Sequence, residues 1–359
     1  MTDFGPAGHD RALATALLAL DAQQWTPTRD LLAATGTNWE LRTARIAILA
    51  AAAQGSTVTE TWLSEEPESR DARVLRAAVS VERARRAAAL QLPQASAYYH
   101  SARTKCLEAA RKDGADPAPW VTTLALASLD IDRLYPESRA PHPDRAQMVP
   151  HGPWAVLDWV QRRHPFNREA FHHGAEFVRA VKAPEIDFIA WALSRPHLPD
   201  TSALHVLPLY AMLRQKAYQQ RNPAWPTEWS KNLSQDAIGR AYHWFTAHSD
   251  PQRDCRIDDL SYLALALWST GEFELAHSVF EVMGPYASLA PFYAAAEDDR
   301  KPAAQADRAE RLFHTVHSQC YKITRSRRRR QAPEGSRRRH AQPDRPNQGV
   351  VSRLLGGNS

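Results

Sequence analysis

The sequence is poor in the residues that build phosphate-binding loops and disulfide frameworks. It has 14 glycines and three cysteines in 359 residues. The cysteines, Cys106, Cys255 and Cys320, are odd in number and far apart, whereas a disulfide scaffold has dense and paired cysteines. The phosphate-loop, dinucleotide-binding, zinc-protease and C-x-x-C motifs are all missing. These absences argue against the enzymes that need such motifs and favour a reducing compartment.

Long hydrophobic runs are missing as well. The apolar run at residues 46–53, IAILAAAA, is much shorter than the ~20 residues that cross a bilayer. Residues 1–24 carry acidic side chains where a secretory signal has basic ones. We therefore expect a cytoplasmic protein without a membrane partner.

Positive charge is confined to the C-terminal end. Residues 322–359 hold eleven Lys or Arg against two acidic residues, a net charge of +9. The whole chain carries +5, so residues 1–321 carry −4. The basic pI of about 9.2 therefore belongs to this end and does not indicate a nucleic-acid-binding domain.

The apolar residues recur at helical spacing. In RVLRAAVSVERARRAAAL, Val74, Leu75, Ala78, Val79 and Val81 recur mostly every three or four residues, with charged residues between them. The alternation that is typical of strands is rare, and prolines mostly fall between the helical runs. The sequence predicts an all-α fold.

Composition divides the chain into four parts. Residues 1–129 and 153–321 read as N-terminal and C-terminal helical repeats, and the Pro-rich residues 130–152 as a surface connection between them. Residues 322–359 are rich in arginine and offer little apolar surface to bury, so they are predicted to be a disordered basic tail.

One stretch, residues 260–284, has the residues of a helical hairpin: LSYLALALWSTGEFELAHSVFEVMG. It resembles a tetratricopeptide repeat, a motif of two antiparallel helices that cross closely at small residues. The matching positions are Leu263, Ala264, Gly271, Phe273, Ala276 and Phe280. Met283 and Ser288 depart from the motif, which usually has a small residue and a proline there.

Weaker similarity extends to other fragments. The matching residues are Pro165, Asn167, Phe171 and Ala175 in HPFNREAFHHGA, then Tyr99, Ala102, Ala109 and Trp120, and finally Trp25 and Leu32. Trp120, Phe171 and Leu260 are anchor positions, but they lie 51 and 89 residues apart, which are not multiples of 34. The resemblance therefore implies an irregular solenoid of helical hairpins, a TPR-like superhelix, and a generic helical bundle is the alternative.

The resemblance also implies a function, because stacked helix pairs form a concave surface that binds peptides or partner proteins. In the family, the first helix of each pair supplies the residues that face the ligand. Carried over to this sequence, the partner-binding positions are Asp258, Ser261, Leu265, Trp268 and Ser269. We expect a non-catalytic interaction or scaffold protein.

No cofactor or metal site is expected. Two acidic pairs resemble part of a metal-binding motif but lack its third aspartate one helical turn later; they are Asp258–Asp259 and Asp298–Asp299. His314, His317 and Cys320 cannot converge on one ion, because Cys320 is rotated ~240° from His314 on a straight helix.

Two other functions stay open. The tail arginines would bind the phosphate backbone of a nucleic acid with little sequence preference, since such contacts release counterions. They are Arg327, Arg328, Arg329, Arg330, Arg337, Arg338 and Arg339. The same tail has the composition of a reading-frame extension in GC-rich DNA, which would give it no role. An enzyme with an unrecognised site is the remaining alternative.

Overall fold

The computed structural model describes residues 2–112, 114–130, 134–142, 149–219, 235–296 and 302–331. Helices make up the regular structure in these ranges, and the only extended pairings there are two isolated bridges, Asp3–Tyr286 and Ala140–Gly152. The prediction of an all-α fold is confirmed.

Two of the N-terminal helices, which start at Arg11 and Trp39, begin after a residue that caps them. The Asp10 and Asn38 side chains accept hydrogen bonds from the backbone N–H groups of Leu13 (2.9 Å) and Leu41 (3.3 Å), as short polar residues do at helix starts. The helices are α1 (Arg11–Asp21), α2 (Thr26–Thr35), α3 (Trp39–Ala53), α4 (Val58–Glu65), α5 (Arg70–Ala89), α6 (Ala95–Lys112) and α7 (Ala118–Leu126).

The middle of the chain continues with shorter elements. They are the 3-10 turns η1 (Ala127–Leu129) and η2 (Pro136–Ser138), α8 (Trp154–Arg163), α9 (Arg168–Ala180), α10 (Glu185–Leu193), the 3-10 turn η3 (Ala203–Val206) and α11 (Leu207–Gln219). The C-terminal helices are α13 (Gln235–Ala247), α14 (Pro251–Asp254), α15 (Ile257–Ser269), α16 (Phe273–Met283), α17 (Ala290–Ala295) and α18 (Pro302–Gln331).

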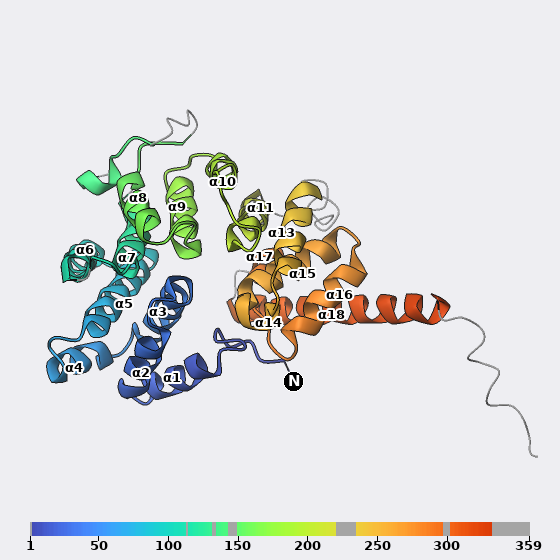
Figure 1. The fold of residues 1–359 in the computed structure, drawn as a ribbon, viewed down its shortest axis with the longest axis horizontal. Helices are drawn as coiled ribbons and strands as arrows, with labels where there is room; N and C mark the ends of the chain where they lie inside the picture. The colour runs from blue at the N-terminus through green and yellow to red at the C-terminus, as the bar shows by residue number, and fades with distance from the viewer. Residues whose placement is uncertain are drawn as a thin grey trace, which may run out of the picture.

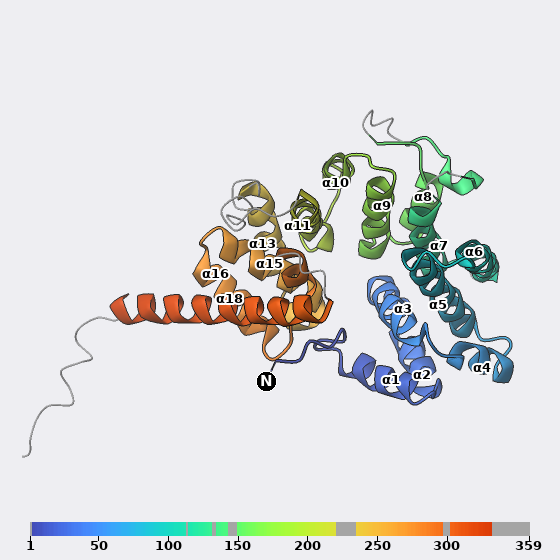
Figure 2. The ribbon, with the colours of Figure 1, turned by 180° about the vertical axis from the view of Figure 1, so that it is seen from behind.

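The helices follow an arc, and the chain closes that arc into a ring (Figure 1). The view from behind shows the same order, from α1 through α9 to α18 (Figure 2). The segment before α1 runs back to the C-terminal helices, where Asp3 pairs with Tyr286. The two ends of the arc therefore meet.

Three hydrophobic cores lie along the arc: an N-terminal core from α1 to α7, a middle core from α7 to α11 and a C-terminal core from η3 to α18. Neighbouring cores share an element. Ala125 of α7 belongs to the N-terminal core and Leu124 to the middle core. The middle core also joins Leu124 to Trp154 across residues 130–152, so the cores do not follow the predicted two-part division.

The prediction of two helices joined by a turn at Gly271 is confirmed. Helices α15 and α16 are joined at Gly271, whose φ of +85° lies in the left-handed region that favours glycine. Ala264 and Ala276 are both completely buried in the C-terminal core. Asn167 caps α9 through the Ala170 N–H at 3.1 Å, which places a helix start where the sequence predicted one.

The prediction of disorder from residue 322 is wrong for residues 322–331, which form the last turns of α18. Thr324 is buried, and Arg327 forms an ion pair with Glu274 of α16 at 3.3 Å. These contacts to the body extend the helix beyond the change in composition. Residues 332–359, with Arg337, Arg338 and Arg339, lie outside the described residues.

Candidate functional site

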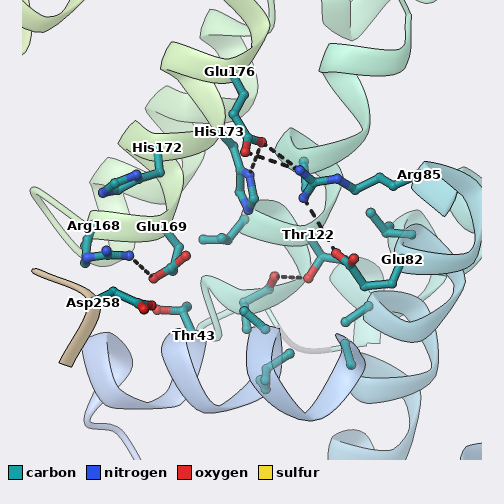
Figure 3. Close-up of a pocket in the computed structure, with 18 of the residues that line it drawn as sticks. Thr43, Glu82, Arg85, Thr122, Arg168, Glu169, His172, His173, Glu176 and Asp258 are labelled. Atoms are coloured by element: carbon teal, nitrogen blue, oxygen red, sulfur yellow. Dashed lines mark hydrogen bonds and ion pairs between the residues drawn. The ribbon is translucent and has the colours of Figure 1, made fainter. Parts of the chain in front are cut away.

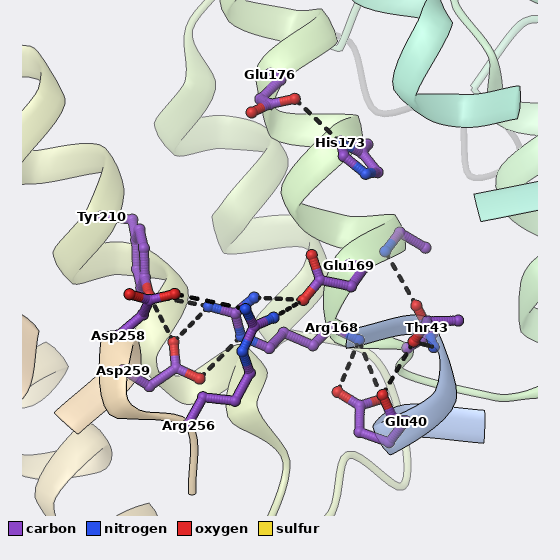
Figure 4. A network of polar contacts seen from close by, with 12 residues as sticks. Glu40, Thr43, Arg168, Glu169, His173, Glu176, Tyr210, Arg256, Asp258 and Asp259 are labelled. Atoms are coloured by element: carbon purple, nitrogen blue, oxygen red, sulfur yellow. Dashed lines mark hydrogen bonds and ion pairs between the residues drawn. The ribbon is translucent and has the colours of Figure 1, made fainter. Parts of the chain in front are cut away.

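A buried ion pair connects the first turn of α9 to α15. The Arg168 guanidinium donates to both carboxylate oxygens of Asp259 in α15, at 2.8 and 2.7 Å (Figure 4). Both side chains are almost wholly buried. Burial alone lowers the pKa of Arg168, but the Asp259 carboxylate outweighs it and raises the pKa above its usual value. This pair joins the middle part of the arc to the C-terminal part.

Tyr210 of α11 completes the pair. Its hydroxyl donates to Asp259 Oδ1 at 2.7 Å and accepts from Arg168 at 2.9 Å. Its ring stacks on Tyr262, with centroids 3.6 Å apart. Burial, together with the Asp259 charge, raises the pKa of Tyr210, so the hydroxyl stays protonated and remains a donor.

Glu169, the next residue of α9, is held by two arginines. Arg168 donates to its carboxylate at 2.6 Å, and Arg256 forms a second ion pair with the same oxygen. Burial raises the pKa of Glu169, but the charges of Arg256 and Arg168 prevail and lower it to about 2. Arg256 also lies 3.4 Å from Asp258.

Glu40 links the same turn to the N-terminal part of the arc. The backbone N–H of Arg168 lies 3.3 Å from both Glu40 oxygens, and Asn167 donates to Thr43 of α3 at 3.1 Å. The Glu40 side chain keeps 42% of its surface open to solvent, yet it stands in a recess surrounded by protein. This desolvation and the nearby Glu169 charge raise the pKa of Glu40 to about 7.

A cavity of about 330 Å³ lies beside this network (Figure 3). One wall is mostly apolar and comes from α3, α5 and α7; its apolar residues are Ile46, Ala47, Ala50, Ala78, Val81, Val121 and Ala125, and its polar ones are Thr43, Glu82, Arg85 and Thr122. The opposite wall is charged and comes from α9 and the start of α15; its residues are Arg168, Glu169, His173, Glu176, Arg256 and Asp258. The cavity therefore presents two chemically different faces to a ligand.

A second cluster closes the charged wall of this cavity. His173 Nδ1 lies 3.1 Å from Glu176, and Arg85 of α5 donates to both Glu176 oxygens at 3.2 Å. Burial raises the pKa of Glu176, but the His173 hydrogen bond and the Arg85 charge lower it to about 2. Glu176 is thus a fixed negative charge that ties α9 to α5.

A larger cavity of about 860 Å³ lies on the other side of the network. Arg168 and Arg256 line both cavities. Pro6, Ala7 and His9 of the segment before α1 line only the larger one, together with Cys255. The ion-pair network is therefore the partition between the two cavities.

The predicted partner-binding face is wrong for Ser261 and Leu265, because both are completely buried. Helix α15 is central in the C-terminal core and packs against α13, α16, α17 and α18. Ser261 donates to the Ile257 carbonyl at 2.8 Å and accepts from the Ser288 N–H at 2.9 Å. Neither side chain is accessible to a partner.

The other three predicted positions are partly exposed but do not share one site. Asp258 lines the smaller cavity. Trp268 donates through its indole N–H to Gln319 of α18 at 2.9 Å, and Ser269 donates to the carbonyl of Ala266 at 2.7 Å. Only Asp258 joins the site built around α9.

The predicted polyanion-binding residues lie on or beyond α18. Arg327 and Arg329 have exposed side chains, and Arg328 and Arg330 belong to the same helix. In the ranges that the structure covers, no group of three or more His, Cys, Asp or Glu side chains is arranged to hold a metal. The Asp298–Asp299 pair lies outside those ranges.

Sequence reasoning missed Glu40, Arg168, Glu169 and Arg256. The stretch NREAF indicates a helix start and nothing more, because Arg and Glu side chains are mostly exposed to solvent. The one available signal was a cap, Asn167, followed by an Arg–Glu pair and Phe171. This signal does not reveal that Asp259 of α15 pairs with Arg168.

No helix among the described residues is long and apolar enough to cross a membrane. The chain matches no family model, no curated protein and no solved structure.

Proposed function

We propose that the protein is a non-catalytic interaction protein that binds a peptide segment of a partner in the cavity of about 330 Å³ at the centre of the ring. The observation that carries the proposal is the contrast between its walls. A mostly apolar wall from α3, α5 and α7, with Glu82 and Arg85 at one side, faces a charged wall from α9 and α15. A peptide with an apolar side chain beside polar groups matches both walls at once.

The hairpin of α15 and α16, with Gly271 in its turn, supports the wider proposal of a TPR-like solenoid. In such a solenoid, helix pairs stack and leave an inner surface for ligands. The binding surface proposed here is formed by α3, α5, α7 and α9 and replaces the face of α15 predicted from the sequence.

The ionisation of the cavity carboxylates supports a non-catalytic role. A general acid or base works best with a pKa near the operating pH, whereas the pKa values of Glu169 and Glu176 are about 2. Glu40, whose pKa is about 7, lines the larger cavity and not this one. We also propose a cytoplasmic location, which the three free, buried cysteines support.

The test is a selection of peptides from a random displayed library on the immobilised full chain, followed by affinity measurements on the selected peptides. Ala47→Trp fills the cavity from α3, and Ala51→Trp places the same side chain on an exposed position of that helix. We expect Ala47→Trp to abolish binding and Ala51→Trp to preserve it. Failure to select any peptide, or equal binding by both variants, would refute the proposal.

A second candidate is nucleic-acid binding through α18. Arg325 and Arg329 have exposed side chains on its last turns, whereas Arg327 pairs with Glu274, and the helix projects from the body (Figures 1 and 2). Exposed arginines bind phosphate through charge and hydrogen bonds. The salt dependence of DNA binding tests this candidate.

A further inference from the structure

The segment before α1, residues 3–9, crosses from the N-terminal end of the arc to its C-terminal end. The Asp3 N–H donates to the Pro285 carbonyl at 2.7 Å, and the Ala287 N–H donates to the Asp3 carbonyl at 3.0 Å. Pro285 and Ala287 follow α16. These hydrogen bonds hold the segment 3–9 to a loop nearly 300 positions away in the sequence.

Side chains of the segment contact both ends of the arc. The half-buried Phe4 ring packs edge-on against Phe313 of α18, with centroids 5.4 Å apart, and joins the C-terminal core. His9 packs edge-on against Tyr286 at 4.7 Å. Ala7 packs against the N-terminal core instead. Seven residues thus connect two cores that belong to opposite ends of the arc.

The segment requires glycine at position 8. The φ of Gly8 is +51°, and a Cβ built on it would lie 3.1 Å from Ile257 Cβ at the start of α15. Gly36, after α2, has a similar φ of +55°, but nothing lies within 4 Å of its Cβ position. A side chain at position 8 would therefore meet backbone strain and a close contact, whereas one at position 36 would meet only the strain.

We propose that residues 3–9 form a latch that joins the two ends of the helical arc and controls entry to its interior. Pro6, Ala7 and His9 line the cavity of about 860 Å³, so release of the latch removes part of that cavity's wall. Besides the close approach of Gly8 to Ile257 and the packing of Ala7, the anchoring contacts are two backbone hydrogen bonds, the ring contacts of Phe4 and His9, and a hydrogen-bond contact between His9 and Gln252 at 3.2 Å. Segments held by few buried contacts open at a low free energy. The role in ligand entry rests on the proposed peptide-binding function, whereas the joining of the two ends does not.

The opening is measured without any ligand. Spin labels are placed at Leu18→Cys on α1, where the native side chain is 75% exposed, and at Glu272→Cys, exposed at the start of α16. Electron–electron distance measurements then follow the two ends of the arc. The three native cysteines are buried, so the labels react first at the introduced positions.

In the protein without spin labels, the rate at which the Cys255 thiol is modified measures the same opening of the latch. It lines the larger cavity with the latch, and its burial raises the pKa of its thiol, which slows its reaction. Cys106 and Cys320 are buried in the N-terminal and C-terminal cores, away from the latch cavity, and serve as internal references. The rate of modification of each cysteine is read by mass spectrometry of the full chain.

We expect Phe4→Ala to lengthen and broaden the distance distribution and to speed Cys255 modification about tenfold, from the loss of a half-buried aromatic anchor. Gly8→Ala should act in the same direction, while Gly36→Ala and Phe4→Leu should resemble the wild type. Unchanged distances and Cys255 rates in both latch variants would overturn the proposal. Because neither readout needs a peptide, that result is distinct from a failure of peptide selection.

Discussion

Arg168 in α9 and Asp259 in α15 are 91 residues apart in sequence and form a buried ion pair through two hydrogen bonds. Taking two charges out of water costs several kcal/mol per ion, and only good geometry with further hydrogen bonds offsets that cost. Tyr210 supplies such a bond to Asp259, and Glu169 supplies one to Arg168. The pair therefore specifies how the middle and C-terminal parts of the arc meet.

Asp259→Asn should lower the free energy of unfolding by about 3–5 kcal/mol, because it leaves Arg168 buried without its main counter-charge. Asp258→Asn is the matched control, since Asp258 is about one-third exposed and lies 3.4 Å from Arg256. It should cost less than about 1 kcal/mol. Urea denaturation of the two variants measures the difference, and equal losses would contradict the assigned role of Asp259.

Two helical glycines should respond to alanine with opposite signs. A Cβ at Gly174 in α9 would lie 2.6 Å from the Phe188 ring, so Gly174→Ala should cost about 1–3 kcal/mol as overpacking. A Cβ at Gly239 in α13 meets nothing within 4 Å, so Gly239→Ala should add up to about 1 kcal/mol through helix propensity. Thermal unfolding of both variants checks the signs. A stabilising Gly174→Ala would mean that Phe188 does not pack there.

Glu40 should make stability depend on pH near neutrality. Its pKa is about 7 in the folded protein and 4.5 as an ordinary glutamate, so the folded state binds the proton more tightly. The contribution of protonated Glu40 to the free energy of unfolding is fully present below pH 4.5. It falls as the pH rises from 4.5 to 7 and is lost above that. Glu40→Gln cannot ionise and keeps an acceptor for the Arg168 N–H.

Relative to the wild type, Glu40→Gln should therefore gain stability at pH 8 and lose that advantage at pH 4.5. Denaturation curves at several pH values measure the change. Identical pH profiles for the two proteins would show that Glu40 titrates normally.

The contact of α15 with α16 gives a test of the hairpin. Ala276 is fully buried, so Ala276→Trp should cost about 1–3 kcal/mol or more through overpacking. Ser269 donates only to the Ala266 carbonyl of its own helix, so Ser269→Ala should change stability by less than about 0.5 kcal/mol. Chemical denaturation measures the loss of unfolding free energy in each variant. Equal losses in the two variants would show that the register of the hairpin is different.

Local patterns in the sequence were sufficient to predict the helices and one helical hairpin. The spacing of apolar residues predicted helix throughout, and Gly271 marked a turn that needs positive φ. Asn167 marked the start of α9, because an asparagine side chain caps a free N–H. These features depend on neighbours within a few residues.

The site and the ring closure depend on distant contacts, which local patterns do not encode. Asp258 and Asp259 are adjacent in sequence, but only Asp259 is buried against Arg168. The family resemblance placed Ser261 and Leu265 on a ligand-facing surface, but both are buried because other helices cover α15. Composition placed the end of the fold at residue 321, whereas Thr324 packs in the body and extends α18.

The arginines at the end of α18 should contribute unequally to DNA binding. Arg325 and Arg329 are four residues apart and so lie within about 40° of each other around the helix. Arg327 is rotated about 200° from Arg325 and pairs with Glu274. Each arginine that contacts phosphate adds about −0.9 to the slope of log affinity against log salt.

The double variant Arg325→Gln and Arg329→Gln should therefore make that slope less negative by about 1.8, the sum for two contacts. Arg327→Gln, the matched control on the opposite side of the helix, should leave the slope unchanged. Fluorescence anisotropy with a labelled DNA duplex over a range of salt concentrations measures the slopes, and circular dichroism checks that the helix persists. If all three arginines contributed equally, the helix would not present one basic face to DNA. If none contributed, α18 would have no role in DNA binding, and the peptide-binding cavity would be the better candidate for function.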